Sequence, residues 1–176
     1  MRRRRLVVLV TVAALLAIMA APVSARTGHV IRGDMDLTFV PQPCDDGRFL
    51  TWVGTVAIDD EVYGWADFPT AELVEKGGWM YFQEYWTIFT LNEGEDPTPA
   101  AACDPALVVI AGENKGIGTP WFTGFAWGKV TEIADGGPFE DVPIGSRMFW
   151  RGSLVEDRPL EPGDNFIAKL RIIARR

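Results

Sequence analysis

From residue 29 onward, hydrophobic and polar positions alternate in short stretches separated by turn-forming residues. The first stretch shows the pattern most clearly, because Ile31, Met35, Leu37 and Phe39 alternate with Arg32, Asp34, Asp36 and Thr38. A period of two residues predicts a strand with one face in a core and the other in solvent. The same pattern predicts strands at residues 29–40, 48–59, 62–68, 79–91, 106–113, 121–134, 144–156 and 164–173.

The connections between these stretches contain almost no helical pattern. Only residues 70–76, which precede Gly77 and Gly78, are typical of a helical turn. Residues 112–118 resemble a phosphate-binding loop superficially, but they lack the GxxxxGK[ST] spacing, so we interpret them as a turn. Eight strands with mostly short connections predict a single antiparallel up-and-down β-barrel of calycin-like architecture. The alternative is a β-sandwich.

Residues 79–91 form the most aromatic of the predicted strands, and Glu84 lies in their middle between Phe82 and Trp86. If this face of the strand points inward, burial raises the pKa of Glu84 and makes it a candidate acid or base. If the opposite face points inward, Glu84 is solvated or paired with a cation. Arg147 and Arg151 are the candidate partners, although they could equally belong to a surface stripe with Lys169 and Arg171.

An eight-stranded barrel either fills its interior with side chains or holds one small ligand there. Large apolar side chains from several strands form the candidate ligand-binding lining: Trp52, Phe82, Trp86, Phe125, Trp127, Met148 and Trp150. The alternative interpretation of each is ordinary core packing, which large aromatic residues dominate in any fold.

The N-terminus has the three parts of a secretory signal. Four Arg residues precede the apolar run 6–21, and the small residues 23–25 follow it. We expect cleavage after Ala25, which leaves residues 26–176 as one β-barrel domain that is secreted and has no membrane attachment. A retained anchor is the alternative, but the run is short for a membrane span and ends at Pro22. The Arg cluster also permits twin-arginine export.

Charge and cysteine content limit the partners and the chemistry. Without residues 1–25, 13 Lys and Arg face 24 Asp and Glu, because four of the 17 basic residues precede Leu6. This excess of negative charge disfavours binding to nucleic acid. His29 is the only histidine, so neither a His-ligated metal site nor a His-based triad can be assembled, and we expect no cofactor and no metal.

Cys44 and Cys103 are the only two cysteines, and in an oxidising compartment they are expected to form a disulfide. A strict up-and-down barrel places their two loops at opposite ends. The disulfide therefore requires residues 92–105 to fold back along the barrel wall, or one strand to be miscounted.

Glycine and aromatic residues recur with a common spacing in several of the predicted strands. The stretches are Gly54-Thr55-Val56, Tyr63-Gly64, residues 82–89, residues 124–130, Arg147 and Gly152-Ser153-Leu154. The spacing of these residues along the strands resembles that of the allene oxide cyclase and dirigent barrels. The resemblance implies an eight-stranded barrel with an apolar cavity open at one end, often in a homotrimer. No catalytic residue of that family aligns with this sequence.

These observations predict a secreted, disulfide-bonded barrel that binds a small apolar molecule in its interior. One alternative is a cyclase or isomerase that acts on a hydrophobic substrate, with Glu84 as the acid or base. Another is an extracellular interaction module whose barrel is filled. The volume of the internal cavity distinguishes the last hypothesis from the first two.

Overall fold

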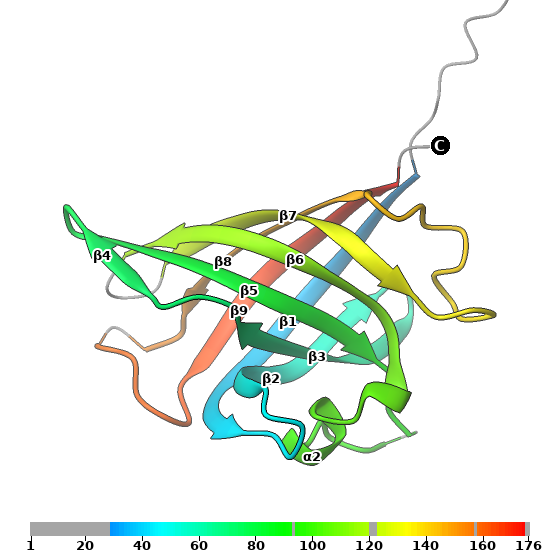
Figure 1. Cartoon of the computed structure of the whole chain (residues 1–176), viewed down its shortest axis with the longest axis horizontal. Helices are drawn as coiled ribbons and strands as arrows, with labels where there is room; N and C mark the ends of the chain where they lie inside the picture. The colour runs from blue at the N-terminus through cyan, green and yellow to red at the C-terminus, as the bar shows by residue number, and fades with distance from the viewer. Residues whose placement is uncertain (1–28, 93, 120–122, 157, 175–176) are drawn as a thin grey trace, which may run out of the picture.

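The computed structural model describes residues 29–92, 94–119, 123–156 and 158–174, so the expected signal segment lies outside the described residues. The fold is a closed antiparallel β-barrel with one additional strand (Figure 1). Its strands are β1 (His29–Pro43), β2 (Phe49–Ile58), β3 (Glu61–Pro69), β4 (Val74–Lys76), β5 (Trp79–Phe89), β6 (Val108–Gly118), β7 (Gly124–Ile133), β8 (Arg147–Leu154) and β9 (Asn165–Ala174).

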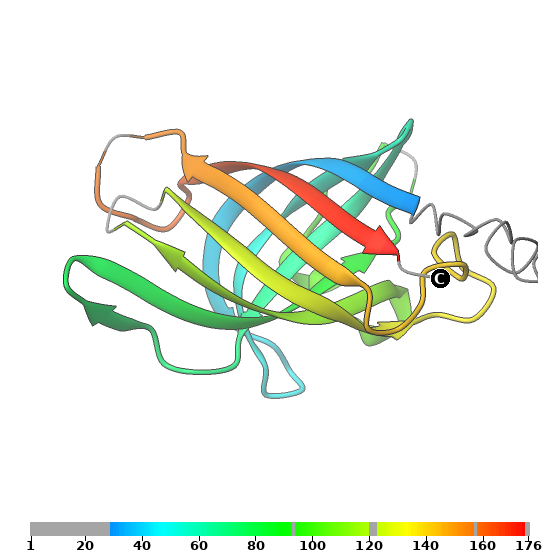
Figure 2. The same cartoon turned by 90° about the horizontal axis from the view of Figure 1, so that it is seen from above.

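The barrel closes through the pairing of its first and last strands. Each of the eight wall strands pairs with its neighbours in the order β1-β2-β3-β5-β6-β7-β8-β9, and β1 also pairs with β9, from His29 opposite Ala174 onward. β1 and β9 lie side by side in both views of the molecule (Figures 1 and 2). The prediction of an eight-stranded antiparallel barrel is therefore confirmed, and the sandwich alternative is wrong.

The extra strand, β4, corrects the helical turn expected at residues 70–76. β4 pairs with the start of β5 as a hairpin, with Lys76 opposite Trp79. Gly77 and Gly78 form the turn with φ angles of 63° and 78°, which suit the tight turns of β-hairpins. A helical pattern of seven residues is too short to be stable alone, whereas the hairpin extends an existing strand.

The expectation of a turn at residues 112–118 is also wrong, because β6 continues to Gly118. The inward-facing glycines of this segment make room for aromatic rings of β5. A Cβ atom added to Gly116 would lie 1.9 Å from the ring of Phe82, and one added to Gly112 would lie 2.5 Å from Trp86. These glycines thus serve packing within a strand, not a turn between strands.

Aromatic rings fill the barrel interior. Trp65 stacks on Trp86 with ring centroids 5.3 Å apart, and Phe82 stacks on Trp150 at 5.6 Å. Around them pack aliphatic residues from seven of the eight wall strands, including Met35, Leu37, Val56, Ile88, Ile110, Val130, Met148, Leu170 and Ile172, while β3 contributes aromatic rings. Large rings from β3, β5 and β8 thus oppose small residues from β6 and β7, and the interior is closely packed.

A second apolar cluster lies on the outer wall of β2 and β3. Residues from the β5–β6 connection cover this wall, and the cluster contains Cys44, Leu50, Val53, Ala66, Phe68, Phe89 and Ala102. The connection includes the short helix α2 (Pro99–Ala102), whose first turn is capped by the Thr98 side chain, and a 3₁₀ turn (Pro105–Leu107). The connection therefore folds back along the barrel wall, as the predicted disulfide required.

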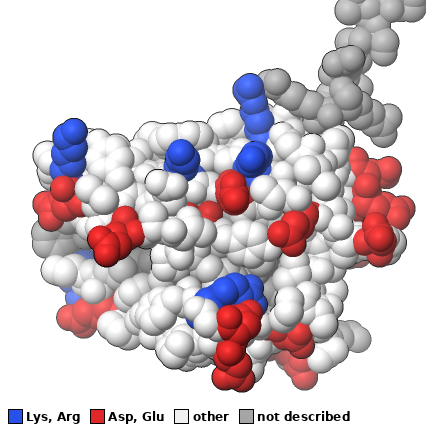
Figure 3. Space-filling model, in the orientation of Figure 1, with Lys and Arg blue, Asp and Glu red and all other residues white. Residues whose placement is uncertain are grey.

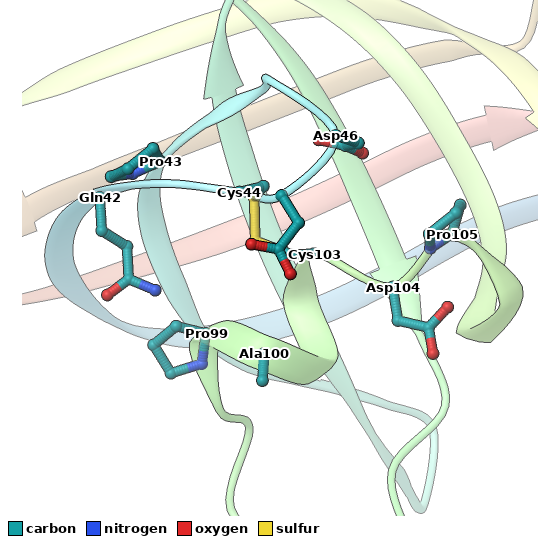
Figure 4. A pocket seen from close by; sticks show the side chains of 10 residues that line it. Gln42, Pro43, Cys44, Asp46, Pro99, Ala100, Cys103, Asp104 and Pro105 are labelled. Carbon is teal, nitrogen blue, oxygen red and sulfur yellow. A yellow bond between two sulfur atoms is a disulfide. The ribbon is translucent and has the colours of Figure 1, made fainter.

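The disulfide between Cys44 and Cys103 fastens this connection to the barrel, with the two Cα atoms 5.6 Å apart (Figure 4). Arg48 supports the same contact. Its guanidinium donates a hydrogen bond to the backbone carbonyl of Cys103 at 2.8 Å and lies 4.4 Å from the ring centroid of Phe68. The predicted pairing of the two cysteines is confirmed.

Candidate functional site

Five of the seven residues predicted to line the interior are in the core. Trp52, Phe82, Trp86, Met148 and Trp150 are all at most 6% exposed. Phe125 and Trp127 are not, because they lie on the outer face of β7 with 51% and 45% of their surfaces exposed.

The correction for Phe125 and Trp127 has a steric reason. The inward positions of β7 are Gly124, Ala126, Gly128 and Val130. Ala126 is directly opposite Trp150, so the large ring comes from β8 and β7 contributes the small residue. The alternation in β7 was correct, but its larger residues face outward because the neighbouring rings already occupy the interior.

The even-numbered face of β5 points inward, and Glu84 is only 6% exposed. With its side-chain amide oriented to satisfy both neighbours, Asn114 links Glu84 to an aromatic residue. The Asn114 nitrogen donates to Glu84 Oε2 at 3.3 Å, and the Asn114 oxygen accepts from Trp150 Nε1 at 3.2 Å. Arg147 and Arg151 are exposed on the outer face of β8, so the expectation that they pair with Glu84 is wrong.

A second carboxyl group, Asp67 on β3, faces the same interior. Asp67 is 3% exposed and is directly opposite Trp86, which places it diagonally across from Glu84 on the adjacent strand. Trp65 Nε1 donates a hydrogen bond to Asp67 Oδ2 at 2.8 Å. The other oxygen, Oδ1, accepts no hydrogen bond from the described residues.

Burial makes both carboxyl groups unusually weak acids. Burial raises the pKa of Asp67 to about 7, and the hydrogen bond from Trp65 opposes this rise. The pKa of Glu84 is raised well above its usual value, first by burial and then by the negative charge of Asp67, while the hydrogen bond to Asn114 opposes the rise. Among the described residues, no Lys or Arg forms an ion pair with either group. Burial therefore favours the protonated form of Glu84, and a pKa of about 7 lets Asp67 exchange a proton near neutral pH.

The gap around these two carboxyl groups is closed. Asp67 and Glu84 border a space with Met35, Trp52, Trp150 and other core side chains that has no room for a water molecule. The open space is instead a hollow of about 320 Å³ at one mouth of the barrel. Its lining is largely apolar, from Phe39, Trp52, Ala71, Leu73, Phe82 and Leu160, and it includes Glu84.

A separate hollow of about 490 Å³ lies beside the disulfide (Figure 4). Two of its three acidic side chains already have partners, since Asp46 pairs with Arg48 and Asp104 accepts a hydrogen bond from the backbone nitrogen of Ala106. Across the part of the chain that the structure describes, no three His, Cys, Asp or Glu side chains are grouped to hold a metal ion. This hollow therefore offers no comparable chemistry.

Sequence reasoning identified Glu84 but missed Asp67 and the mouth hollow. No alternation of polar and apolar residues marked Asp67, because Ala66 and Phe68 on the other face of β3 are buried as well.

Comparison with known proteins yields no relative: no family model matches the chain, and neither a curated protein nor a solved structure matches it. Within the described ranges, no helix has the length and hydrophobicity needed to cross a membrane.

Proposed function

We propose that the protein binds a small, largely apolar molecule in the mouth hollow, with Glu84 at its inner boundary. The observation that carries this proposal is the convergence of apolar side chains and one buried carboxyl group on a single open space. A volume of about 320 Å³ is within the range of small-molecule sites, which are mostly apolar with a few polar groups that orient the ligand. The ligand is assigned to the mouth because the deeper interior is filled.

The raised pKa of Glu84 favours its protonated form, and this limits which polar groups a ligand can carry. A protonated carboxyl donates one hydrogen bond, whereas an ionised one only accepts. The hollow therefore suits an apolar molecule that carries a hydrogen-bond acceptor, such as a carbonyl or ether oxygen. An anionic ligand is disfavoured, because Glu72 also lines the hollow and no Lys or Arg does.

Catalysis is the second candidate function, and the proximity of Asp67 to Glu84 favours it. Two carboxyl groups with different raised pKa values supply a proton donor and a potential proton acceptor near pH 7. Such a pair suits an isomerase or cyclase that moves a proton on a hydrophobic substrate. The substrate would reach Glu84 from the mouth, and Asp67 would act through Glu84.

A cavity-filling variant tests the binding proposal. Ala71→Trp places a ring in the hollow, and Ala57→Trp adds the same ring at an exposed position of β2 as the matched control. The probe is N-phenyl-1-naphthylamine, whose fluorescence increases in apolar sites. We expect saturable binding to the wild type and to Ala57→Trp, and at least about tenfold weaker binding to Ala71→Trp. Equal binding to all three proteins, or none to the wild type, would contradict the proposal.

The catalytic alternative has a distinct test. Native mass spectrometry of protein purified from its own host identifies a retained small molecule by mass. Incubation of that molecule with the wild type and Glu84→Gln then separates binding from turnover. Conversion by the wild type alone, with the molecule still bound by the variant, supports catalysis; unchanged molecule in both samples supports binding only.

A further inference from the structure

A groove on the outer wall of the barrel is lined by outward-facing side chains of several strands, and the inward-facing residues Glu84 and Asn114 also border it. It has a volume of about 580 Å³ and crosses β5, β6, β7 and the start of β8. The strand register explains how its side chains come together. Gln83, Lys115 and Trp127 lie directly opposite one another on successive strands, and Glu113, Lys129 and Arg147 form the next row.

The cations of this groove are poorly neutralised. Lys129 approaches Glu113 at 4.0 Å, but both side chains are at least 60% exposed, so the pair is weak. Lys115 and Arg147 form no ion pair with any described residue. Figure 3 shows several Lys and Arg side chains along the upper part of this face, with acidic atoms just below them and more acidic atoms at the right edge. A chain with 24 acidic residues and 17 basic ones thus has a local positive site.

Trp127 supplies a flat apolar surface within the same groove. Its side chain is 45% exposed and lies beside Phe125, with ring centroids 5.7 Å apart. The backbone of the next residue, Gly128, also lines the groove, because this position of β7 faces inward. An exposed indole with a bare backbone beside it gives a ligand a surface on which a ring can stack.

We propose that this groove binds an anionic glycan, a chain of sugar rings that carry carboxylate groups. The apolar face of one sugar stacks on Trp127, and carboxylates of the chain pair with Lys115 and Arg147. Gln83 and Thr70, which also line the groove, provide hydrogen bonds for hydroxyl groups. Lys115 and Arg147 lie two strands apart, about 10 Å of sheet width, so they suit an extended chain with spaced charges better than one compact anion.

Other partners fit this groove less well. A bilayer is flat and cannot reach the floor of a concave groove. A second copy that used the same face would bring the cations of both copies together, since a two-fold interface is self-complementary. A long nucleic acid would be repelled by the overall acidity of the chain, because its phosphates are closely spaced.

Affinity electrophoresis in gels that contain a polymer tests the proposal. The probes are polygalacturonate, neutral pullulan, and polyaspartate, which carries carboxylates without sugar rings. We expect wild-type protein to be retarded by polygalacturonate most strongly, with an affinity that decreases as salt rises. Ala71→Trp, which fills the mouth hollow, should bind polygalacturonate as the wild type does. The two hollows share Gln83 and Glu84 at their borders, so this variant distinguishes binding in the groove from binding in the mouth.

Two matched pairs of variants identify the groove as the binding site. Lys115→Gln/Arg147→Gln should weaken binding by roughly tenfold or more, whereas Arg32→Gln/Lys76→Gln removes two exposed cations elsewhere and should have little effect. Trp127→Ala should weaken binding similarly, while Trp79→Ala, at a residue of nearly equal exposure (46%), should not. Unchanged thermal unfolding of all four variants shows that their folds are intact.

Three results would overturn the proposal. The first is equal retardation by polyaspartate and polygalacturonate, which would indicate charge attraction without sugar recognition. The second is equal losses in the groove variants and their controls. The third is no retardation by polygalacturonate, including the case in which the protein binds anionic phospholipid vesicles instead.

Discussion

The inner face of the β5–β8 wall carries an acidic group without a cationic partner, and its outer face carries cations without acidic partners, among the described residues. On the inner face, Glu84 lies near Asp67 of β3 without a cationic partner among the described residues. On the outer face, Lys115 and Arg147 form no ion pair with a described residue. Only the thickness of one sheet separates the two sets, yet strand alternation points them away from each other. Neighbouring strands can therefore carry opposite charges that form no salt bridge.

The two faces also differ in how much a charged group on each lowers the free energy of unfolding. The outer cations remain in water and need no compensation. An ionised carboxyl in the interior would lose its hydration without a partner, so it takes up a proton instead. Burial is thus the reason why the interior carboxyl groups, and not the exposed cations, are expected to change protonation near neutral pH.

The largest expected difference between the faces concerns two tryptophans. Trp150→Ala should destabilise the fold by roughly 3–5 kcal/mol, because Trp150 is 5% exposed and stacks on Phe82. Trp127→Ala, on the outer face of the neighbouring strand, should cost less than about 1 kcal/mol. Equilibrium denaturant unfolding measures both values. Equal losses would mean that the inner and outer faces of β7 and β8 have been assigned incorrectly.

Removing the disulfide measures how much the covered outer wall of β2 and β3 contributes to stability, for comparison with the interior. Replacing both Cys44 and Cys103 with Ala should cost roughly 2–5 kcal/mol, since it frees the connection that buries Phe68 against the wall. Reduced wild type should lose a similar amount of stability. Thiol titration of unfolded, unreduced protein should find no free thiol, and two thiols per chain would disprove the bond.

The smallest of the three effects depends on pH. The folded-state pKa of Asp67 is about 7, whereas its unfolded-state value is about 3.9. Wild-type stability should therefore be highest below pH 4 with respect to this group and should decrease as pH rises toward 7. Glu84 adds to the decrease in the same direction, because its folded pKa is also raised.

Neutral replacements measure this effect directly. Asp67→Asn should be more stable than the wild type at pH 7, by an amount on the order of 1–3 kcal/mol, and similar to it at pH 4. Glu84→Gln should change stability in the same direction. Glu113→Gln, on the outer face of β6, is the control and should follow the wild type at both pH values. If Asp67→Asn and the wild type gave parallel stability curves from pH 4 to 7, the carboxyl would be ionised and stabilised by a partner.

The sequence predicted the barrel because alternation survives in most strands, and it predicted the disulfide because only two cysteines are present. It could not locate Asp67, because β3 is buried on both faces. Ala66 and Phe68 face outward, but the β5–β6 connection covers them, so the alternation of polar and apolar residues disappears. Trp127 was placed on the wrong face for a related reason. Residue size indicates burial only when the space opposite is free.

The pairing of β1 with β9 sets the order in which this protein can fold. Residues 29–38 need partners in residues 165–174, so the barrel cannot close until the ribosome has synthesised the ninth strand. Until then β1 and β8 each expose an unpaired edge, which is a template for pairing with other chains. Such non-local pairing also makes closure slow compared with the formation of local hairpins. Loss of β9 is therefore expected to yield an aggregating chain, not a smaller working barrel.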